Sequence, residues 1–197
     1  MADSGARVHA LLCPKAESAQ DLAELHAWLP SAFGQLIALI ETPAGMEQAS
    51  AIAGAVHQGA PRLTALMLGG ADLSMELGAQ FGWDGLWWAR ARLVNAARSH
   101  GLQAWDVPFI DVADAAGLQQ ETRRVLALGY DCKAAIHPAQ LAPLHQAFQP
   151  DADELAWARG LLDEVAKAPA AGAFLYQGKL VDQPILQRAR RIVRRAA

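Results

Sequence analysis

The chain has 197 residues, of which 53% are hydrophobic and 19% are charged, and its formal net charge at pH 7 is -3. This composition excludes a disordered chain and is typical of one compact globular unit. Because no basic field would draw the chain to nucleic acid or to a membrane surface, we expect a small molecule as its partner.

Five short apolar runs alternate with helical patterns in the first 150 residues. We predict these runs to be strands, at residues 8–14, 35–40, 63–68, 102–110 and 133–136. Strands that are apolar on both faces and separated by amphipathic helices indicate an α/β fold, in which helices cover a parallel sheet. The pair Trp87 and Trp88 is predicted to pack one of these helices, residues 86–100, against the sheet.

Local signals mark where the helices begin and end. Ser18, Thr42 and Asp114 stand at positions typical of helix caps, and the helix after Thr42 is predicted to run without a break to Val56. The helix at residues 86–100 is expected to end at Gly101, since glycine is common just after a helix.

The pattern changes near residue 150, so we predict two domains, an α/β domain at 1–150 and an appendage at 151–197. The appendage should contain a helix, a short extended piece and a final helix. Five arginines crowd its end: Arg188, Arg190, Arg191, Arg194 and Arg195. Two interpretations stay open, a solvated helix end that complements the helix dipole or a site for an anionic ligand or partner, such as a cofactor phosphate.

Polar residues that follow the apolar runs are the candidates for chemistry, because the carboxyl ends of parallel strands converge at one edge of the sheet. They are Lys15, Glu41, Asp72, Asp106, Asp111 and His137. No glycine cluster matches a nucleotide-binding fingerprint.

Glu41 and Asp72 end two consecutive predicted strands, so their carboxylates should point to the same place. Two hard carboxylates with open positions suit Mg²⁺, which retains several ligands that are not protein. The alternative is that Asp72 caps a helix and Glu41 pairs with Lys15 or faces water. His137 has a similar alternative, a helix-start residue whose ring bonds to the backbone.

Six segments in order carry a resemblance to a known family: LLCPKAES, LIALIETPAG, LMLGGADLSMELG, ARARLVNAARSHGLQAWDVPFIDVADAAGL, ALGYDCKAAIHPAQL and FLYQGKLVDQPIL. Together they resemble the citrate lyase beta-subunit-like branch of the HpcH/HpaI aldolase family. The resemblance runs from about residue 8 to the end of the chain. It implies a TIM-barrel-like (β/α)8 fold and a Mg²⁺-dependent carbon–carbon lyase acting on citryl-, malyl- or citramalyl-CoA.

The resemblance also implies roles for individual residues. Glu41 and Asp72 fall on the metal-binding acids of the family, and Asp182 falls where relatives place a catalytic acid that reaches a neighbouring subunit. We expect Lys15 as a second catalytic residue. The residues expected to contact the substrate are Gly70, Asp106 and His137.

Measured against the family pattern, the chain begins at the fourth barrel strand, so we expect five strands and the absence of a substrate-binding arginine. We favour a homo-oligomer that covers the open sheet, located in the cytoplasm. Two other functions stay open, a catalytically incomplete paralogue that binds metal or acyl-CoA, and an aldolase of small free acids. Ala71 stands where many relatives have Glu.

Overall fold

The structure is a computed structural model and describes residues 8–30, 33–167 and 172–196. The chain divides into two compact units, Met1–Leu141 and Ala142–Ala197, which are described separately below. The domain boundary after residue 150 stays a prediction from the sequence.

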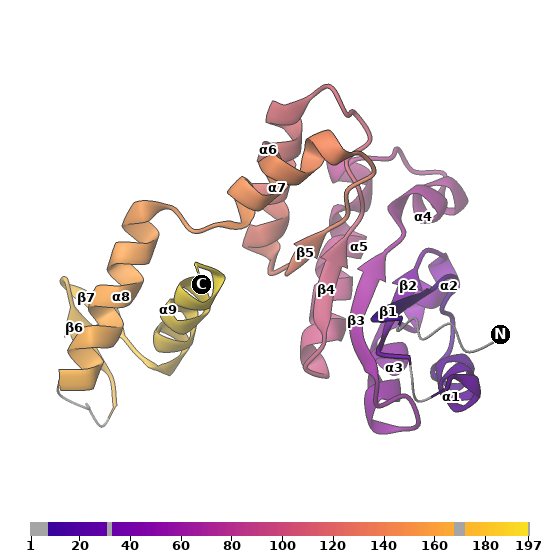
Figure 1. The fold of residues 1–197 in the computed structure, drawn as a ribbon, viewed down its shortest axis with the longest axis horizontal. Coiled ribbons are helices and arrows are strands. Elements are labelled where there is room, and N and C mark those ends of the chain that lie inside the picture. Colours follow the sequence, from indigo (N-terminus) through magenta and orange to yellow (C-terminus); the bar gives the residue numbers. More distant parts are fainter. Residues whose placement is uncertain (1–7, 31–32, 168–171, 197) are drawn as a thin grey trace. The chain divides into compact units, whose positions relative to one another are not determined.

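The first unit is built on a sheet of five parallel strands in the order β1-β2-β3-β4-β5 (Figure 1). The strands are β1 (Ala10–Cys13), β2 (Gln35–Ile40), β3 (Leu63–Leu68), β4 (Gln103–Asp106) and β5 (Cys132–Lys133). Each strand pairs with the next one along the chain, as expected for successive strand–helix units. The predicted number of strands is confirmed, although the first, fourth and fifth are shorter than predicted.

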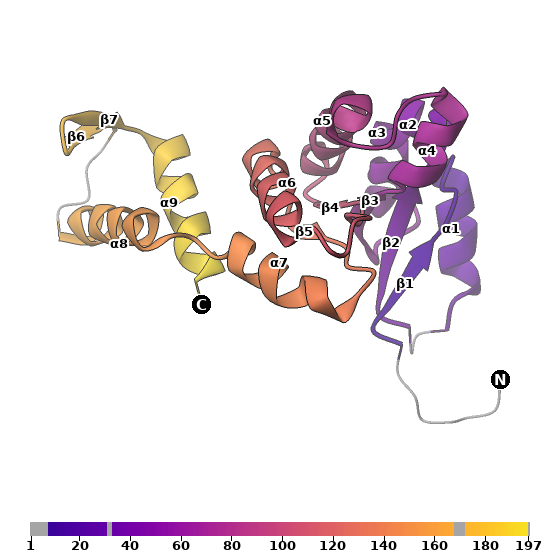
Figure 2. The same cartoon turned by 90° about the horizontal axis from the view of Figure 1, so that it is seen from above.

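Helices follow each strand of this unit (Figure 2). They are α1 (Ala19–Trp28), α2 (Pro43–Glu47), α3 (Ala49–Gly54), η1 (Ala55–His57), α4 (Gly70–Leu77), α5 (Trp83–Ser99), α6 (Ala115–Leu128) and η2 (Pro138–Gln140). The predicted caps are confirmed: the side chains of Ser18, Thr42 and Asp114 accept backbone N–H groups of α1, α2 and α6. The prediction of one unbroken helix after Thr42 is wrong, because Gln48, at φ -90° and ψ 3°, separates α2 from α3.

The core of this unit lies between the sheet and its helices. Leu36, Ala38 and Ile40 of β2 point into it, because alternate residues of a strand share a face. The prediction for the tryptophan pair is wrong. Trp87 and Trp88 are about half exposed, at 52% and 48%, since Leu86, Ala89 and Leu93 form the buried stripe of α5 instead.

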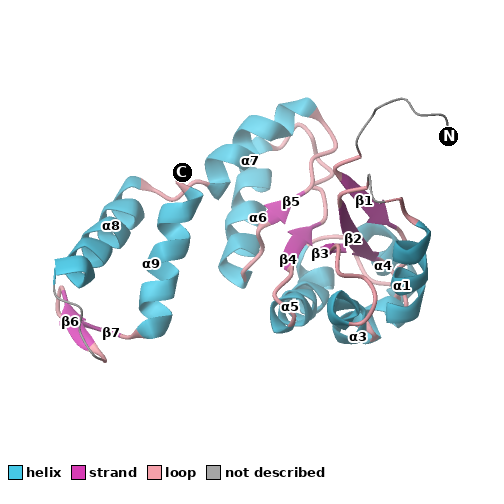
Figure 3. Cartoon of the chain, turned by 60° about the horizontal axis from the view of Figure 1, so that its bottom comes forward, coloured by secondary structure: helices cyan, strands magenta, loops and turns pink. Residues whose placement is uncertain are grey.

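The second unit, whose helices and strands are drawn in Figure 3, has a small core of its own. Its elements are α7 (Leu141–Phe148), α8 (Ala152–Lys167), β6 (Phe174–Tyr176), β7 (Lys179–Val181) and α9 (Gln183–Arg195). Gln177 and Gly178, at φ 49° and 74°, turn the chain between the antiparallel strands β6 and β7. Leu161 of α8 and Leu186, Ala189 and Ile192 of α9 bury against each other.

No helix among residues 8–30, 33–167 and 172–196 is long and apolar enough to cross a membrane.

Candidate metal centre

Glu41 and Asp72 line one cavity at the carboxyl edge of the sheet. The cavity has a volume of about 170 Å³ and lies where β2, β3 and β4 end. Its lining is Leu39, Glu41, Met67, Leu68, Gly69, Gly70, Ala71, Asp72, Val107 and Pro108. The two predicted metal ligands and the predicted substrate contact Gly70 therefore meet at one site.

Glu41 follows the last residue of β2 and is buried, with 8% of its surface exposed. Its Oε1 accepts a hydrogen bond of 2.9 Å from the backbone N–H of Lys15. Gly69 leaves the room that the carboxylate occupies: a Cβ on that residue would lie 2.3 Å from the Glu41 Cβ and 2.9 Å from Oε2. The Glu41 carboxylate is thus oriented by the backbone of Lys15 rather than by its ammonium group, in a space that the absence of a side chain at Gly69 leaves open.

Asp72 stands in the first turn of α4 and is exposed. Gly69 is the N-cap of this helix, so the alternative interpretation, in which Asp72 caps a helix, is wrong. A carboxylate in the first turn is favoured by the positive end of the helix dipole. Within the described part of the chain, no hydrogen bond or ion pair occupies the Asp72 carboxylate, which leaves its oxygens available to a ligand.

The donor set fits a magnesium ion. Two carboxylates from neighbouring strand ends face one cavity, and no third His, Cys, Asp or Glu joins them among the residues that the structure describes. Mg²⁺ is commonly held by one or two carboxylates while water and substrate fill its other positions, whereas a structural zinc site needs four protein ligands.

Lys15 has a backbone conformation that is unusual for a residue with a side chain, at φ 49°. Such a conformation costs about 1 kcal/mol or more and persists where surrounding contacts hold it. Here the contact is the hydrogen bond from Lys15 N–H to Glu41. The side chain of Lys15 is exposed and does not line the cavity, so its predicted catalytic role stays a prediction.

Asp106 is fully buried and lies in an ion-pair network on the helix side of the sheet. Its Oδ1 accepts from Arg90 Nε at 2.8 Å, and its Oδ2 accepts from Lys133 Nζ at 2.6 Å. Glu121 of α6 accepts from both cations, at 3.3 Å and 2.7 Å. Asp106 does not line the cavity with Glu41. A substrate would have to displace Arg90 or Lys133 to reach its carboxylate.

The partners of Asp106, which are Arg90, Glu121 and Lys133, were not predicted from the sequence. A signal for one of them was present, since Arg90 stands on the same face of α5 as the buried residues Leu86, Ala89 and Leu93. A cation on an apolar helix face requires a buried anion to compensate it. Lys133 also donates to the Val107 carbonyl at 2.7 Å, and Val107 lines the cavity.

The other predicted site residues lie elsewhere. His137 immediately precedes η2, and its Nδ1 accepts the Ala139 N–H at 3.1 Å. These contacts agree with the alternative interpretation of His137, a helix-start residue whose ring bonds to the backbone. Asp182 belongs to the second unit and caps α9 by accepting the Ile185 N–H at 3.3 Å. These contacts test neither the substrate contact predicted for His137 nor the catalytic role predicted for Asp182.

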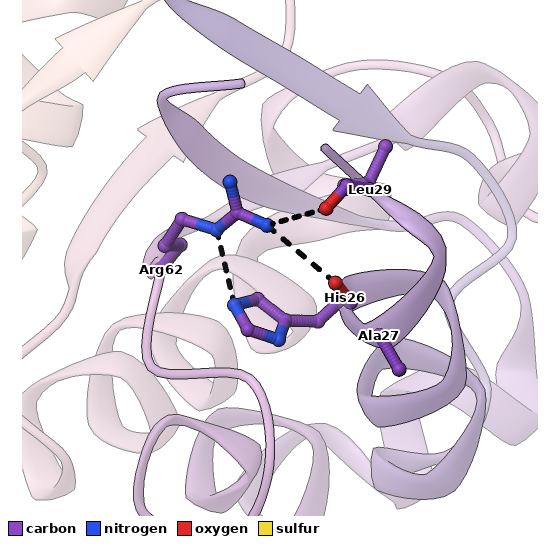
Figure 4. A pocket seen from close by; sticks show the side chains of 4 residues that line it. All are labelled: His26, Ala27, Leu29 and Arg62. Carbon is purple, nitrogen blue, oxygen red and sulfur yellow. Dashed lines mark hydrogen bonds between the residues drawn. The ribbon is translucent and has the colours of Figure 1, made fainter. Parts of the chain in front are cut away.

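A second cavity, of about 450 Å³, is lined by His26, Ala27, Leu29 and Arg62 (Figure 4). Arg62 immediately precedes β3, so this cavity is at the amino end of that strand. Its guanidinium donates to His26 Nε2 at 3.0 Å and to backbone carbonyls at the end of α1, including Leu29 O at 3.3 Å. Arg62 therefore ties α1 to the sheet.

Residues 1–138 match the family model of the HpcH/HpaI aldolase/citrate lyase family. The chain belongs to this family. The resemblance on which the sequence analysis relied is confirmed, and with it the α/β class of the fold.

Named relatives support the assignment. A citrate lyase subunit beta-like protein of Mycobacterium tuberculosis is 34% identical over 98% of this chain and 68% of the relative. An L-malyl-CoA/beta-methylmalyl-CoA lyase of Rhodobacter capsulatus is 34% identical over 98% of this chain and 69% of the relative. Among solved structures, CitE from Mycobacterium tuberculosis in complex with magnesium, acetoacetate and coenzyme A matches with a TM-score of 0.79. The identity is 34%, over 95% of this chain and 68% of that one.

Proposed function

We propose that this protein is a Mg²⁺-dependent carbon–carbon lyase of 3-hydroxyacyl-CoA thioesters of the citryl-, malyl- or citramalyl-CoA type. The observation that carries the proposal is the meeting of Glu41 and Asp72 at one cavity, in a chain similar to malyl-CoA lyases and to a protein that binds magnesium and coenzyme A.

Glu41 and Asp72 would hold the metal ion. Bound Mg²⁺ supplies a Lewis acid and a template for the carboxylate and hydroxyl oxygens of the substrate. Glu41 is already oriented by the Lys15 N–H, so little reorganisation is needed on binding. Gly70 lies at the start of α4, where backbone N–H groups and the helix dipole favour negative charge that develops on the substrate.

The bond-breaking step needs a base that accepts the proton of the substrate hydroxyl. When that proton leaves, the hydroxyl carbon becomes a carbonyl, and the electrons of the broken carbon–carbon bond form the enolate of the acyl-CoA product. Proton transfer to the enolate carbon completes the reaction. We assign the base to Asp182, delivered by another copy of the chain in a homo-oligomer, with Lys15 and His137 contacting the organic acid.

The first test measures cleavage of malyl-, citramalyl- and citryl-CoA with and without Mg²⁺. Glu41→Gln and Asp72→Asn should each lower the rate by about a thousandfold or more, because each removes a ligand of the ion that stabilises the transition state. Glu76→Gln is the matched control, since Glu76 is an exposed acid on the same helix as Asp72. Turnover that survives both ligand changes contradicts the proposal, and Mg²⁺ binding without turnover favours the catalytically incomplete paralogue.

The second test concerns the shared site. Glu41→Gln and Asp182→Asn chains should each be inactive alone, whereas a refolded mixture should recover activity, because mixed oligomers contain one site with both Glu41 and Asp182 intact. A mixture as inactive as its parents contradicts the assignment of Asp182 to a neighbouring copy.

A further inference from the structure

The second unit carries a groove that the lyase proposal does not use. The groove has a volume of about 540 Å³ and lies between α8 and α9, two helices that pack against each other and are labelled in Figure 3. Its lining is Leu162, Gln187, Arg190, Arg191, Val193 and Arg194. Three of these six residues are arginines and none is an acid.

The arginines reach the groove because of their spacing along α9. Gln187, Arg190, Arg191 and Arg194 follow the spacing i, i+3, i+4 and i+7, which places side chains on one side of a helix. The apolar residues of α9, including Leu186 and Ile192, are buried against α8 and fix the orientation of the helix. Folding of this unit therefore gathers three guanidinium groups along one groove.

The charge of these arginines is not compensated within the described part of the chain. Arg188 shows the contrast, since it pairs with Glu154 at 3.4 Å and lies 5.6 Å above the ring of Trp157. In the same described part, no ion pair involves Arg190, Arg191 or Arg194. The helix dipole explains a cation in the last turn, such as Arg194, but not Arg190 and Arg191 a turn earlier.

Adjacent guanidinium groups match the oxygens of phosphate groups, because each planar guanidinium donates two parallel hydrogen bonds. Three of them suit a diphosphate better than a single carboxylate. Leu162 and Val193 add an apolar part to the lining, which suits an organic group attached to the phosphates. We propose that this groove binds a soluble organic diphosphate of the nucleoside diphosphate class.

A membrane surface is a weaker explanation for the same arginines. An amphipathic helix that lies on a membrane inserts its apolar face into the lipid. The apolar face of α9 is already buried against α8, and the chain as a whole has a net charge of -3, which opposes attraction to anionic lipid and to nucleic acid. A soluble anion, by contrast, can bind in the groove without contact between the apolar face of α9 and lipid.

Isothermal titration calorimetry on the full chain tests the proposal with pyrophosphate and adenosine diphosphate as probes. One site per chain is expected, and the triple change Arg190→Gln, Arg191→Gln and Arg194→Gln should weaken it by about a hundredfold, because it removes charge-assisted hydrogen bonds. The charge-matched control is Arg123→Gln, Arg159→Gln and Lys179→Gln, three exposed cations outside the groove. This control should bind within about twofold of the unchanged protein, since it alters only the long-range field.

The proposal is overturned if the unchanged protein binds neither probe, or if both triple variants weaken binding equally. Binding only to phosphatidylserine vesicles or only to DNA overturns it as well. The Glu41→Gln chain should keep full affinity for both probes, so failure of the lyase proposal and failure of this one give different results. Circular dichroism of each variant verifies that the helices are retained.

Discussion

Two regions of the first unit each hold a pair of carboxylates near the carboxyl edge of the sheet, and the surroundings of the two pairs differ. In the buried network, Asp106 and Glu121 bond to Arg90 and Lys133 over distances of 2.6 to 3.4 Å. Among the described residues, the lining of the cavity with Glu41 and Asp72 contains no cationic side chain. An acid that follows a strand thus either pairs with buried cations, as Asp106 does, or leaves oxygens available to a ligand, as Asp72 does.

The two regions touch through the backbone of one residue. Lys133 Nζ donates to the Val107 carbonyl, and Val107 and Pro108 form part of the cavity wall. The network thus holds in place a segment that faces the proposed metal ion. Changes in the network should alter stability first, whereas changes in the cavity should alter metal binding first.

The largest difference is expected between two identical substitutions, Asp106→Asn and Asp72→Asn. Asp106→Asn leaves Glu121 as the only anion that pairs with Arg90 and Lys133 among the described residues. Because the site is buried, the change should lower the free energy of unfolding by about 3 to 5 kcal/mol. Asp72→Asn removes an exposed first-turn acid and should cost less than about 1 kcal/mol. Urea unfolding measures both, and equal losses would contradict the distinction between the two regions.

Gly69→Ala should disturb the cavity without removing a ligand. The backbone of Gly69, at φ -95° and ψ 70°, does not itself require glycine, so the effect comes from the new Cβ, which would lie 2.3 Å from the Glu41 Cβ. We expect a loss of about 1 to 3 kcal/mol in the free energy of unfolding, because overpacking forces atoms apart. Mg²⁺ affinity should fall with it, by about tenfold or more, since the Glu41 carboxylate moves.

Gly54→Ala is the control for that change. Gly54 is a buried helical glycine, and a Cβ there would meet its nearest atom, His100 Cε1, at 3.4 Å, which is ordinary contact. Its substitution should leave Mg²⁺ affinity unchanged and stabilise the fold by about 0.4 to 1 kcal/mol, because alanine has less freedom in the unfolded chain. If Gly69→Ala behaves like Gly54→Ala, the close approach of Gly69 to Glu41 is not important.

Local signals explain most of what the sequence predicted correctly. The caps at Ser18, Thr42 and Asp114 depend on side chains and backbone groups within three residues of each other. The runs 35–40 and 63–68 became strands with the predicted bounds, because continuous apolar residues identify strands buried on both faces. The rule that ligands bind at strand ends then selected Glu41 and Asp72, which line one cavity, while their role as metal ligands stays a prediction.

The features that could not be predicted from the sequence depend on contacts between residues that are far apart in the chain. A position at the end of a strand does not say which face the side chain takes, and Asp106 shares its face with Ala104, toward the helices. Its partner Arg90 is separated from it by most of α5, and no short motif links the two. Likewise, Lys15 was predicted to be a catalytic residue, and the hydrogen bond from Lys15 to Glu41 comes from its backbone N–H.

The smallest expected effect tests the edge of the buried network, at Tyr130. The Tyr130 hydroxyl is buried and donates to the Arg90 carbonyl at 3.2 Å. Tyr130→Phe should cost about 1 kcal/mol at pH 7, because it removes one neutral hydrogen bond. Burial raises the pKa of Tyr130 well above its usual value of 10.0, and the nearby Asp106 carboxylate raises it further.

The sign of the pH dependence follows from that shift. Above about pH 10 the unfolded chain releases the phenol proton while the folded chain retains it, so the free energy of unfolding falls as pH rises. The contribution of the Tyr130 hydroxyl is therefore fully present below pH 10 and is lost at higher pH. Urea unfolding from pH 7 to 11 should show the advantage of the unchanged protein over Tyr130→Phe shrinking with pH. A constant advantage up to pH 11 would mean that Tyr130 titrates equally in both states, and that the network leaves its surroundings accessible to water.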